Sequence, residues 1–564
     1  MKAITKLLTT IVLCIVMVHV NADATTPTIL SRANQEQMNA WVEATLNTLT
    51  LEERIGQLYV MTIDPNLTDE NRREIDKWVK ECHIGGLLFS GGWLEKQAQV
   101  TNYAQSISRI PLLITLDGEW GLGMRLKDSP SFPRALTIGA IRDESLIYRM
   151  GQEVARECRR MGIHVNFAPV VDINDIEMGS MLDTRSYGQS PLNISRKAIA
   201  FAKGMESGGV VATAKHFPGH GSATGDSHLM LPTVKKTLRQ THDIDLVPFK
   251  NFINEGLSGV MVAHLFIPTI EPDTIPGTLS PRMVNGLLKN ELGFQGLAIT
   301  DALQMEGARS KGSVSVQAIL AGNNILLCPD SLPNEIKAVK EAIDKGIISQ
   351  ETIAERARQV LRYKFALGVT TPQHVDTENL VAEVYSAEAK SLMTELWENA
   401  ITMLPGKKEA LPLCDSKRVA VVSLCDPAGT ESPFQNTCGQ LSPTTRYSYM
   451  PGDNVDSLVN AINNGRFDAV VIGIFDKEKQ RKLPNQRIIA DILASGCKHV
   501  IPVFMCNALE LKNFSYTLDR CDKAVVAFSN EEQAQVQAAR TLFGANQARG
   551  TMPMDIGKFY QCPK

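Results

Sequence analysis

Short apolar runs alternate with longer amphipathic stretches through the first two thirds of the chain. Such runs are typical of buried strands, and the stretches between them have the periodicity of helices. The runs lie at 58–62, 86–89, 112–116, 166–171, 210–213, 259–263, 296–300 and 325–327. Eight strands separated by helices predict a (β/α)8 TIM-like barrel, with a doubly wound open sheet as the alternative topology.

The last third of the chain repeats this alternation on a smaller scale. Its apolar runs lie at 419–424, 469–474, 500–505 and 524–528, which predicts an α/β sandwich domain. The chain has 564 residues, more than one hydrophobic core usually serves. We therefore expect a barrel over 23–372 and a second domain over 373–564, both of class α/β.

The first residues have the pattern of a secretory signal. Lys2 and Lys6 precede the nearly all-apolar stretch 7–20, and the small residues Ala22 and Ala24 follow it. The stretch is too short for a permanent membrane span, and no later segment is long enough. We expect residues 1–22 to be a signal peptide and the mature protein to be periplasmic or secreted, without stable membrane insertion.

Composition and charge exclude some classes of partner. The chain is 44% hydrophobic and 21% charged, as ordinary globular proteins are, and its formal net charge is −3. This charge gives no electrostatic case for binding nucleic acid or an anionic membrane surface. Cys82, Cys158 and Cys328 adjoin apolar elements and are expected to be buried thiols. A disulfide between Cys425 and Cys438 would close a loop, but the sequence does not determine the connectivity.

A barrel carries its functional side chains at the carboxyl ends of its strands. Five of the predicted strands end in polar or charged residues: Asp117, Asp172, Lys215 with His216, His264, and Asp301. A single Asp after a strand is often only a helix cap. Because the polar ends recur at one rim, we expect the active site there.

The stretch 215–228 concentrates groups that can do chemistry. It holds one lysine, three histidines and a carboxylate: Lys215, His216, His220, Asp226 and His228. A loop that only turns the chain does not need them. A metal site would use His216 and His220, which meet on one face of a helix, but Pro218 and Gly219 between them disfavour a helix. We therefore favour an acid/base loop and expect neither a metal nor another cofactor.

Residues 215–228 resemble the signature of bacterial β-N-acetylglucosaminidases of glycoside hydrolase family 3. In that signature the lysine and the first histidine bind the sugar, which implies this role for Lys215 and His216. The Asp-x-His pair acts as acid and base, which implies this role for His228. Asp226 would orient the imidazole and stabilise its protonated form, and a histidine titrates near neutrality without help.

Asp301, in the segment 297–307, resembles the nucleophile of this family. A carboxylate at a strand end can attack an anomeric carbon, which gives a covalent glycosyl-aspartate intermediate and retention of configuration. Most retaining glycosidases use a second carboxylic acid as acid/base. The resemblance implies that His228 replaces it here.

The segment 117–125 is similar to the family's sugar-binding turn. Asp117 and Arg125 occupy its two binding positions. Trp120 and Leu122 stand where the family usually has Gly and Arg, so the middle of the turn departs from the pattern. The indole of Trp120 could instead stack on a sugar face.

Two further residues fit sugar-binding positions of the family. Arg185 lies in the segment 183–188, where the alternative is a solvated surface arginine, and His264 could equally be a buried, hydrogen-bonded histidine. The region after 375 resembles the family's second domain. In β-glucosidases of the family that domain contributes the catalytic acid, but the Asp-x-His loop makes this unnecessary, so we expect a structural or rim role for it.

The resemblance implies a retaining exo-β-N-acetylglucosaminidase that releases terminal N-acetylglucosamine from cell-wall fragments or chitooligosaccharides. A β-N-acetylglucosaminide phosphorylase is an alternative, because a histidine acid/base lacks the negative charge that repels phosphate. A β-glucosidase of the same family and, in a different class, a non-catalytic cell-wall-binding protein are further alternatives. Carbohydrate is the expected partner, and the sequence does not determine the oligomeric state.

Overall fold

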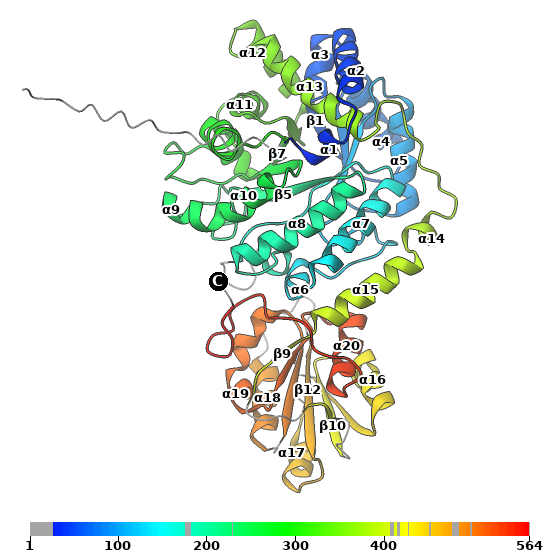
Figure 1. The fold of residues 1–564 in the computed structure, drawn as a ribbon, viewed down its shortest axis with the longest axis vertical. Coiled ribbons are helices and arrows are strands. Elements are labelled where there is room, and N and C mark those ends of the chain that lie inside the picture. The colour runs from blue at the N-terminus through cyan, green and yellow to red at the C-terminus, as the bar shows by residue number, and fades with distance from the viewer. Residues whose placement is uncertain are drawn as a thin grey trace, which may run out of the picture.

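A barrel and a separate sheet make up the protein (Figure 1). The computed structural model describes residues 26–174, 182–227, 229–406, 411–413, 418–426, 428–450, 453–475, 484–496 and 499–562. The expected signal peptide and His228 lie outside these ranges. The barrel is closed, which confirms the expected (β/α)8 architecture and rules out the open sheet.

The barrel strands are parallel and follow one another around the barrel in chain order. They are β1 (Tyr59–Ile63), β2 (Gly86–Phe89), β3 (Leu113–Leu116), β4 (Val165–Asn166), β5 (Val211–Phe217), β6 (Gly259–Val262), β7 (Leu297–Ala302) and β8 (Ile325–Leu327). Their sequences are almost continuously apolar because the barrel interior buries one face of each strand and the helices bury the other.

Helices surround the barrel, and most begin at a Ser, Thr, Asn or Asp that caps the first turn. At α8, for example, Ser190 Oγ accepts a hydrogen bond from the Asn193 N–H. The helices of this region are α1 (Thr28–Ser31), α2 (Gln35–Thr48), α3 (Leu51–Gly56), α4 (Asp69–Asp76), α5 (Leu94–Ser106), α6 (Ala135–Gly139), α7 (Glu144–Arg160), α8 (Pro191–Ser207), α9 (Leu238–Gln240), α10 (Leu246–Asn254), α11 (Val314–Ala321), α12 (Leu332–Asp344), α13 (Gln350–Ala366), α14 (Leu380–Val384) and α15 (Ala387–Ala400).

Helical segments of other types lie between these elements and in the second domain. Three are π-helical: η1 (Lys77–Glu81), η4 (Thr241–Asp245) and η6 (Arg282–Glu291). The 3-10 turns are η2 (Leu122–Met124), η3 (Asp183–Arg185), η5 (Gly277–Leu279), η7 (Glu306–Ala308), η9 (Gly429–Glu431) and η10 (Ala508–Phe514). Two of them adjoin or carry residues expected to bind sugar: η2 directly precedes Arg125, and η3 ends with Arg185.

The fourth strand is shorter than the apolar run 166–171 predicts. It ends at Asn166, and beyond it only Val170 makes a further β-bridge, to Lys215. Pro169 lies between these points and has no backbone N–H, so the ladder cannot continue through it. An apolar run therefore overstated the length of this strand.

The fifth and seventh strands extend further than expected, to Phe217 and Ala302. Lys215, His216 and Asp301 therefore lie within strands instead of after them. The ladder between β5 and β6 shifts register between Ala214 and Phe217. Polar side chains at the carboxyl ends of the strands do not end the pairing, because they point into the mouth of the barrel.

The second sheet has the strand order β11-β10-β12-β13-β14-β9, in which only β9 is antiparallel to its neighbour. Its strands are β9 (Thr402–Leu404), β10 (Val419–Leu424), β11 (Thr444–Tyr449), β12 (Ala469–Phe475), β13 (Val500–Met505) and β14 (Ala524–Val526), and its helices are α16 (Pro433–Leu441), α17 (Asp456–Asn463), α18 (Pro484–Gly496), α19 (Ser515–Arg520) and α20 (Glu532–Leu542). The four expected strands are present. The edge strand β11 is mostly polar and half-buried, so no apolar run revealed it.

The two faces of this sheet have separate apolar clusters, and one of them receives side chains from the barrel region. Leu136 of α6 and Ala140 directly after α6 pack with Met552 and Met554 in the cluster on that face. The Thr551 N–H also donates to the Ala140 carbonyl at 2.8 Å. The two parts of the chain therefore share a core.

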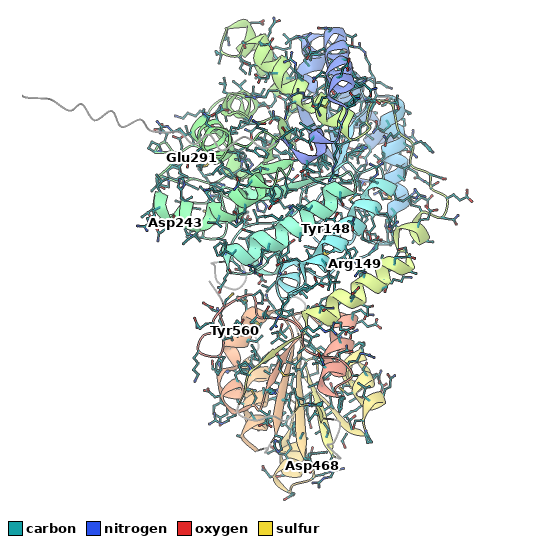
Figure 2. The ribbon with its side chains drawn as sticks, viewed as in Figure 1. Tyr148, Arg149, Asp243, Glu291, Asp468 and Tyr560 are labelled. Atoms are coloured by element: carbon teal, nitrogen blue, oxygen red, sulfur yellow. The ribbon has the colours of Figure 1, made fainter. Side chains whose placement is uncertain are left out.

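A second junction lies along α15, which Figure 1 shows between the barrel and the second sheet. Arg149 of α7 forms an ion pair of 2.9 Å with Glu395 of α15, and Figure 2 shows Arg149 on this side of the barrel. Both side chains are about half exposed, so this pair contributes little to stability.

Cys82, Cys158 and Cys328 are buried thiols, as expected. Cys438 is also a buried thiol, so it does not form the disulfide with Cys425 that the sequence allowed. Burial raises the pKa of the Cys438 thiol. Within the described ranges, no helix combines the length and the apolar character that crossing a bilayer requires.

Candidate active site

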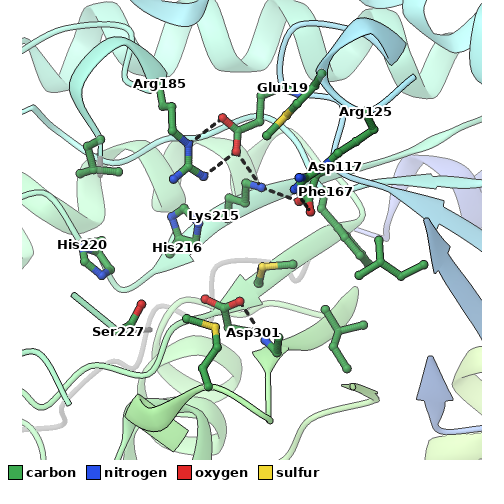
Figure 3. A pocket seen from close by; sticks show the side chains of 17 residues that line it. Asp117, Glu119, Arg125, Phe167, Arg185, Lys215, His216, His220, Ser227 and Asp301 are labelled. Carbon is green, nitrogen blue, oxygen red and sulfur yellow. Dashed lines mark hydrogen bonds and ion pairs between the residues drawn. The ribbon is translucent and has the colours of Figure 1, made fainter. Parts of the chain in front are cut away.

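A cavity of about 310 Å³ opens at the carboxyl ends of the barrel strands. Polar side chains from β3, β4, β5 and β7 or the loops after these strands line it, together with apolar side chains that include Phe167, Met124, Met261 and Met305. Figure 3 shows the charged groups gathered on one side of this cavity and Asp301 on the other. The size lies at the lower end of the range for small-molecule sites and suits a single sugar ring.

Five charged side chains form a continuous network on the first wall. Arg125 Nη2 donates to Asp117 Oδ2 at 2.8 Å, and Lys215 Nζ donates to Asp117 Oδ1 at 2.8 Å. Lys215 Nζ also lies 2.9 Å from Glu119 Oε1. Arg185 donates two hydrogen bonds to Glu119, from Nε to Oε2 at 2.9 Å and from Nη2 to Oε1 at 2.5 Å. The structure thus brings together four of the predicted sugar-binding residues.

Mutual attraction keeps Asp117, Glu119 and Lys215 charged. Burial alone would raise the pKa of Asp117, but the Lys215 ammonium and the Arg125 guanidinium hold it below its ordinary value. Burial would likewise raise the pKa of Glu119, but Lys215 and Arg185 outweigh this effect and lower it. Burial would lower the pKa of Lys215, yet Asp117 and Glu119 raise it. The wall therefore offers fixed donors and acceptors of the kind that sugar hydroxyls require.

Glu119 is the member of this network that the sequence reading missed. It lies two residues after Asp117 in the same turn, and its side chain is buried between Lys215 and Arg185. The sequence did contain a signal for it, because Glu119 is a second carboxylate in the turn that already carried the candidate Asp117. Arg185 is mostly buried against Glu119, which excludes the alternative of a solvated surface arginine.

His216 lines the cavity beside Lys215, and Asp172 fixes its orientation. His216 Nδ1 lies 2.6 Å from Asp172 Oδ2, and the His220 N–H donates to Asp172 Oδ1 at 2.7 Å. Burial would raise the pKa of Asp172, but His216 lowers it overall. One buried carboxylate thus positions His216 at the end of β5 and His220 in the loop after it.

His220 also lines the cavity, although the resemblance assigned it no role. Its burial lowers the pKa of the imidazole, only partly offset by Asp172, so His220 is neutral at pH 7. The rings of His216 and His220 are 6.0 Å apart between centroids. In the parts of the chain that the structure describes, no three His, Cys, Asp or Glu side chains are grouped to hold a metal ion.

Asp301 lies near the end of β7 on the opposite wall (Figure 3). The Ala302 N–H donates to Asp301 Oδ1 at 2.8 Å and fixes the carboxylate. Burial would raise the pKa of Asp301, but His264, His216 and this N–H lower it below its ordinary value. Asp301 is therefore an ionised carboxylate at neutral pH, as a nucleophile must be.

The loop after β5 reaches the cavity at Ser227, and it is tied to the segment that follows Asp301. Ser227 lines the cavity, and its carbonyl accepts a hydrogen bond of 3.0 Å from the Gly307 N–H. Asp226 precedes it and is partly buried. The roles expected for Asp226 and His228 remain predictions, because His228 lies outside the described residues.

His264 and Trp120 are not among the residues that line the cavity. His264 is fully buried, with Nε2 3.0 Å from the Ala302 carbonyl and Nδ1 2.8 Å from Thr278 Oγ1. It contacts the residue after Asp301, so it helps to fix the backbone beside the expected nucleophile. The ring of Trp120 is covered on one face by the Arg134 guanidinium, 4.6 Å from the ring centroid.

We predict that Glu119→Gln destabilises the fold and weakens sugar binding, because Lys215 and Arg185 lose their shared carboxylate. Breaking a buried pair in this way costs about 3–5 kcal/mol at pH 7. The pKa of Glu119 is lower in the folded than in the unfolded chain, so its stabilisation is present above the unfolded value of 4.5 and is lost as pH falls. Denaturant unfolding at pH 7 and pH 3 measures the loss of stability and its dependence on pH, and KM at pH 7 measures the loss of binding.

The control for this prediction is Glu395→Gln, which breaks the exposed pair with Arg149. It should change the free energy of unfolding by less than about 1 kcal/mol at either pH. If the difference between wild type and Glu119→Gln were the same at pH 3 as at pH 7, Glu119 would not be stabilised as a carboxylate.

Known proteins resemble this chain over both of its parts. A β-hexosaminidase of Nitrosomonas eutropha is 32% identical over 327 residues, which are 54% of this chain and 92% of that protein. The β-hexosaminidase A of Pseudoalteromonas piscicida is 25% identical over 558 residues, covering 86% of this chain and 91% of the relative. The first relative is thus too short to hold both a barrel and a second domain of this size.

Solved structures share the fold over nearly the whole chain. A glycoside hydrolase family 3 β-N-acetylglucosaminidase from Paenibacillus sp. str. FPU-7 matches with a TM-score of 0.73 and 27% identity, over 90% of this chain and 99% of that one. A β-glucoside phosphorylase matches with a TM-score of 0.78 at 22% identity, over 94% and 99% of the two chains. The model of the glycosyl hydrolase family 3 N-terminal domain matches residues 50–363. The chain belongs to glycosyl hydrolase family 3.

Proposed function

We propose that this protein is a retaining exo-β-N-acetylglucosaminidase. The observation that carries the proposal is the placement of an ionised Asp301 across a sugar-sized cavity from a wall of paired charges. One wall can hold the hydroxyl groups of a terminal sugar while the carboxylate faces the reacting carbon. The cavity has room for one ring, which supports removal of single terminal residues.

The reaction begins with attack by Asp301 on the anomeric carbon of the bound sugar. The bond to the aglycone oxygen breaks as the new C–O bond to Asp301 forms, and His228 gives its proton to the leaving oxygen. Water then attacks the anomeric carbon, one of its protons passes to His228, and the bond to Asp301 breaks to restore the free carboxylate. Two inversions give net retention, and the lowered pKa of Asp301 keeps the nucleophile ionised throughout the neutral range.

The choice of N-acetylglucosamine rests on the relatives. Those 32% and 25% identical are β-hexosaminidases, and the Paenibacillus enzyme is a β-N-acetylglucosaminidase. Export, which the sequence of residues 1–22 supports, would bring the enzyme to cell-wall fragments or chitooligosaccharides. A phosphorylase and a β-glucosidase of the same family remain the alternatives, and a non-catalytic cell-wall-binding protein is the alternative without activity.

A panel of aryl β-glycosides that differ in the 2-substituent tests this proposal. We expect the 2-acetamido substrate to be cleaved with the highest kcat/KM and the first product to be the β-anomer of the free sugar. Each assay is repeated with added phosphate. A sugar 1-phosphate as the main product would identify a phosphorylase, preference for the 2-hydroxy substrate a β-glucosidase, and no cleavage at all a binding protein.

The nucleophile can be tested separately. Asp301→Ala should lower kcat by roughly 10⁴-fold or more, because the covalent step loses its reacting atom. In the wild type, a 5-fluoro glycosyl reagent should trap the intermediate on Asp301, as mass spectrometry of a peptic digest would show. A label on any other carboxylate would refute the assignment.

If His228 is the acid/base, the loss of rate on its removal should depend on the leaving group of the substrate. A dinitrophenolate needs no proton whereas a sugar alkoxide does, so His228→Ala should slow sugar aglycones far more than activated aryl ones. The aryl substrate should then show a burst followed by slow turnover, and azide, which needs no deprotonation, should speed the second step. Asp226→Asn should show the same pattern more mildly. Equal losses on both substrates without azide rescue would place the acid/base elsewhere.

A further inference from the structure

The loop that carries Arg185 lies where the barrel meets the second domain. Asn507 of the second domain donates through Nδ2 to Asp183 Oδ1 at 2.5 Å, and the Gln189 N–H donates to the Pro553 carbonyl at 3.0 Å. The backbone segments at Gly188 and Pro553 approach so closely that a Cβ on Gly188 would lie 2.2 Å from the Pro553 oxygen. Residues 182–190 are therefore held by two separate segments of the second domain.

Asn507 is fixed within its own domain before it reaches the barrel. It follows β13 and caps η10, since its Oδ1 accepts a hydrogen bond of 3.1 Å from the Leu509 N–H. The amide group thus has its oxygen bound to the second domain and its nitrogen bound to the barrel loop. Asn507 is buried and Asp183 is half-buried, so the contact is partly shielded from water.

The orientation of the second sheet explains why a residue after β13 faces the barrel. Asp468, which directly precedes β12, lies at the tip of the second domain far from the barrel (Figure 2). The neighbouring strands β10, β12, β13 and β14 are parallel, so all of them run toward the barrel and end there. The direction of β13 thus places Asn507 at the junction with the barrel.

The contact at Asp183 leads directly to the sugar-binding wall. Asp183 and Arg185 are the first and last residues of the single turn η3, so a shift of one moves the other. Arg185 grips Glu119, and Glu119 shares the ammonium group of Lys215 (Figure 3). Two hydrogen-bonded steps therefore connect Asn507 to the network.

We propose that Asn507 is a positioning residue of the sugar site. It holds η3 so that Arg185 meets Glu119 in the geometry that binds substrate, and the second domain thereby completes a site whose lining residues all belong to the barrel. The proposal rests on the sugar-binding role of Arg185 given under the proposed function. We had expected a structural or rim role for the second domain. Under this proposal, the second domain instead contributes to substrate binding by holding Arg185 in place.

The test is to turn the contact into a repulsion and then to restore it with the partners exchanged. Asn507→Asp keeps an oxygen that can cap η10 but places a carboxylate against Asp183, so kcat/KM should fall roughly 10- to 100-fold, as expected for a small displacement of a binding group. In the double variant Asn507→Asp with Asp183→Asn, the donor and the acceptor change places, and most of the loss should be recovered. Asp183→Asn alone should have a small effect.

Two further variants separate positioning from general destabilisation. Asn513→Asp makes the same change on the same turn, beside the exposed Glu510, and should leave kcat/KM unchanged. Asn507→Ser keeps a capping oxygen but cannot reach Asp183, so it should lower kcat/KM in the same direction even if Asn507→Asp fails to fold. In an Arg185→Ala background, the change at Asn507 should have no further effect on kcat/KM.

The substrate for all variants is whichever aryl glycoside of the panel the wild type cleaves best, so a wrong substrate assignment leaves this test intact. The proposal is overturned if Asn507→Asp and Asn507→Ser match Asn513→Asp in kcat/KM. It is also overturned if the double variant is no better than Asn507→Asp, or if the losses at Asn507 and Arg185 are simply additive.

Discussion

The ammonium group of Lys215 is the point on which the site depends. It is buried at the end of β5 and joins two carboxylates, each of which is held from its other side by an arginine. Buried charges persist only when they are paired, so each member fixes the position of the next. A closed barrel brings the five groups together although they come from three separate parts of the chain.

The two walls of the cavity differ in their charges. On one wall the ion network is rigid and keeps its charge, which suits the recognition of hydroxyl groups. On the other wall Asp301 is ionised and accepts a hydrogen bond from the Ala302 N–H, and His264 contacts the carbonyl of Ala302. The Gly307 N–H joins this wall to the loop at Ser227, so the segment after Asp301 and the segment beside the expected acid/base are positioned relative to each other.

Much of this arrangement could be predicted from the sequence, because barrel strands are apolar runs and their polar ends are conspicuous. Lys215, His216 and Asp301 were found in this way, and all three line the cavity. Other features had no local signal. The edge strand β11 is too polar to form an apolar run, and Asn507 looks like an ordinary helix cap until the fold brings it to a residue 324 positions away.

The sharing of one apolar cluster between α6 and the second sheet bears on how independent the two parts of the chain are. Leu136 and Ala140 come early in the chain, whereas the strands and the tail that they pack against come last. If the second domain were separated from the barrel, these two side chains and the apolar residues opposite them would be exposed to water. The two domains are therefore coupled in stability through this one cluster, whereas the cluster on the other face of the sheet belongs to the second domain alone.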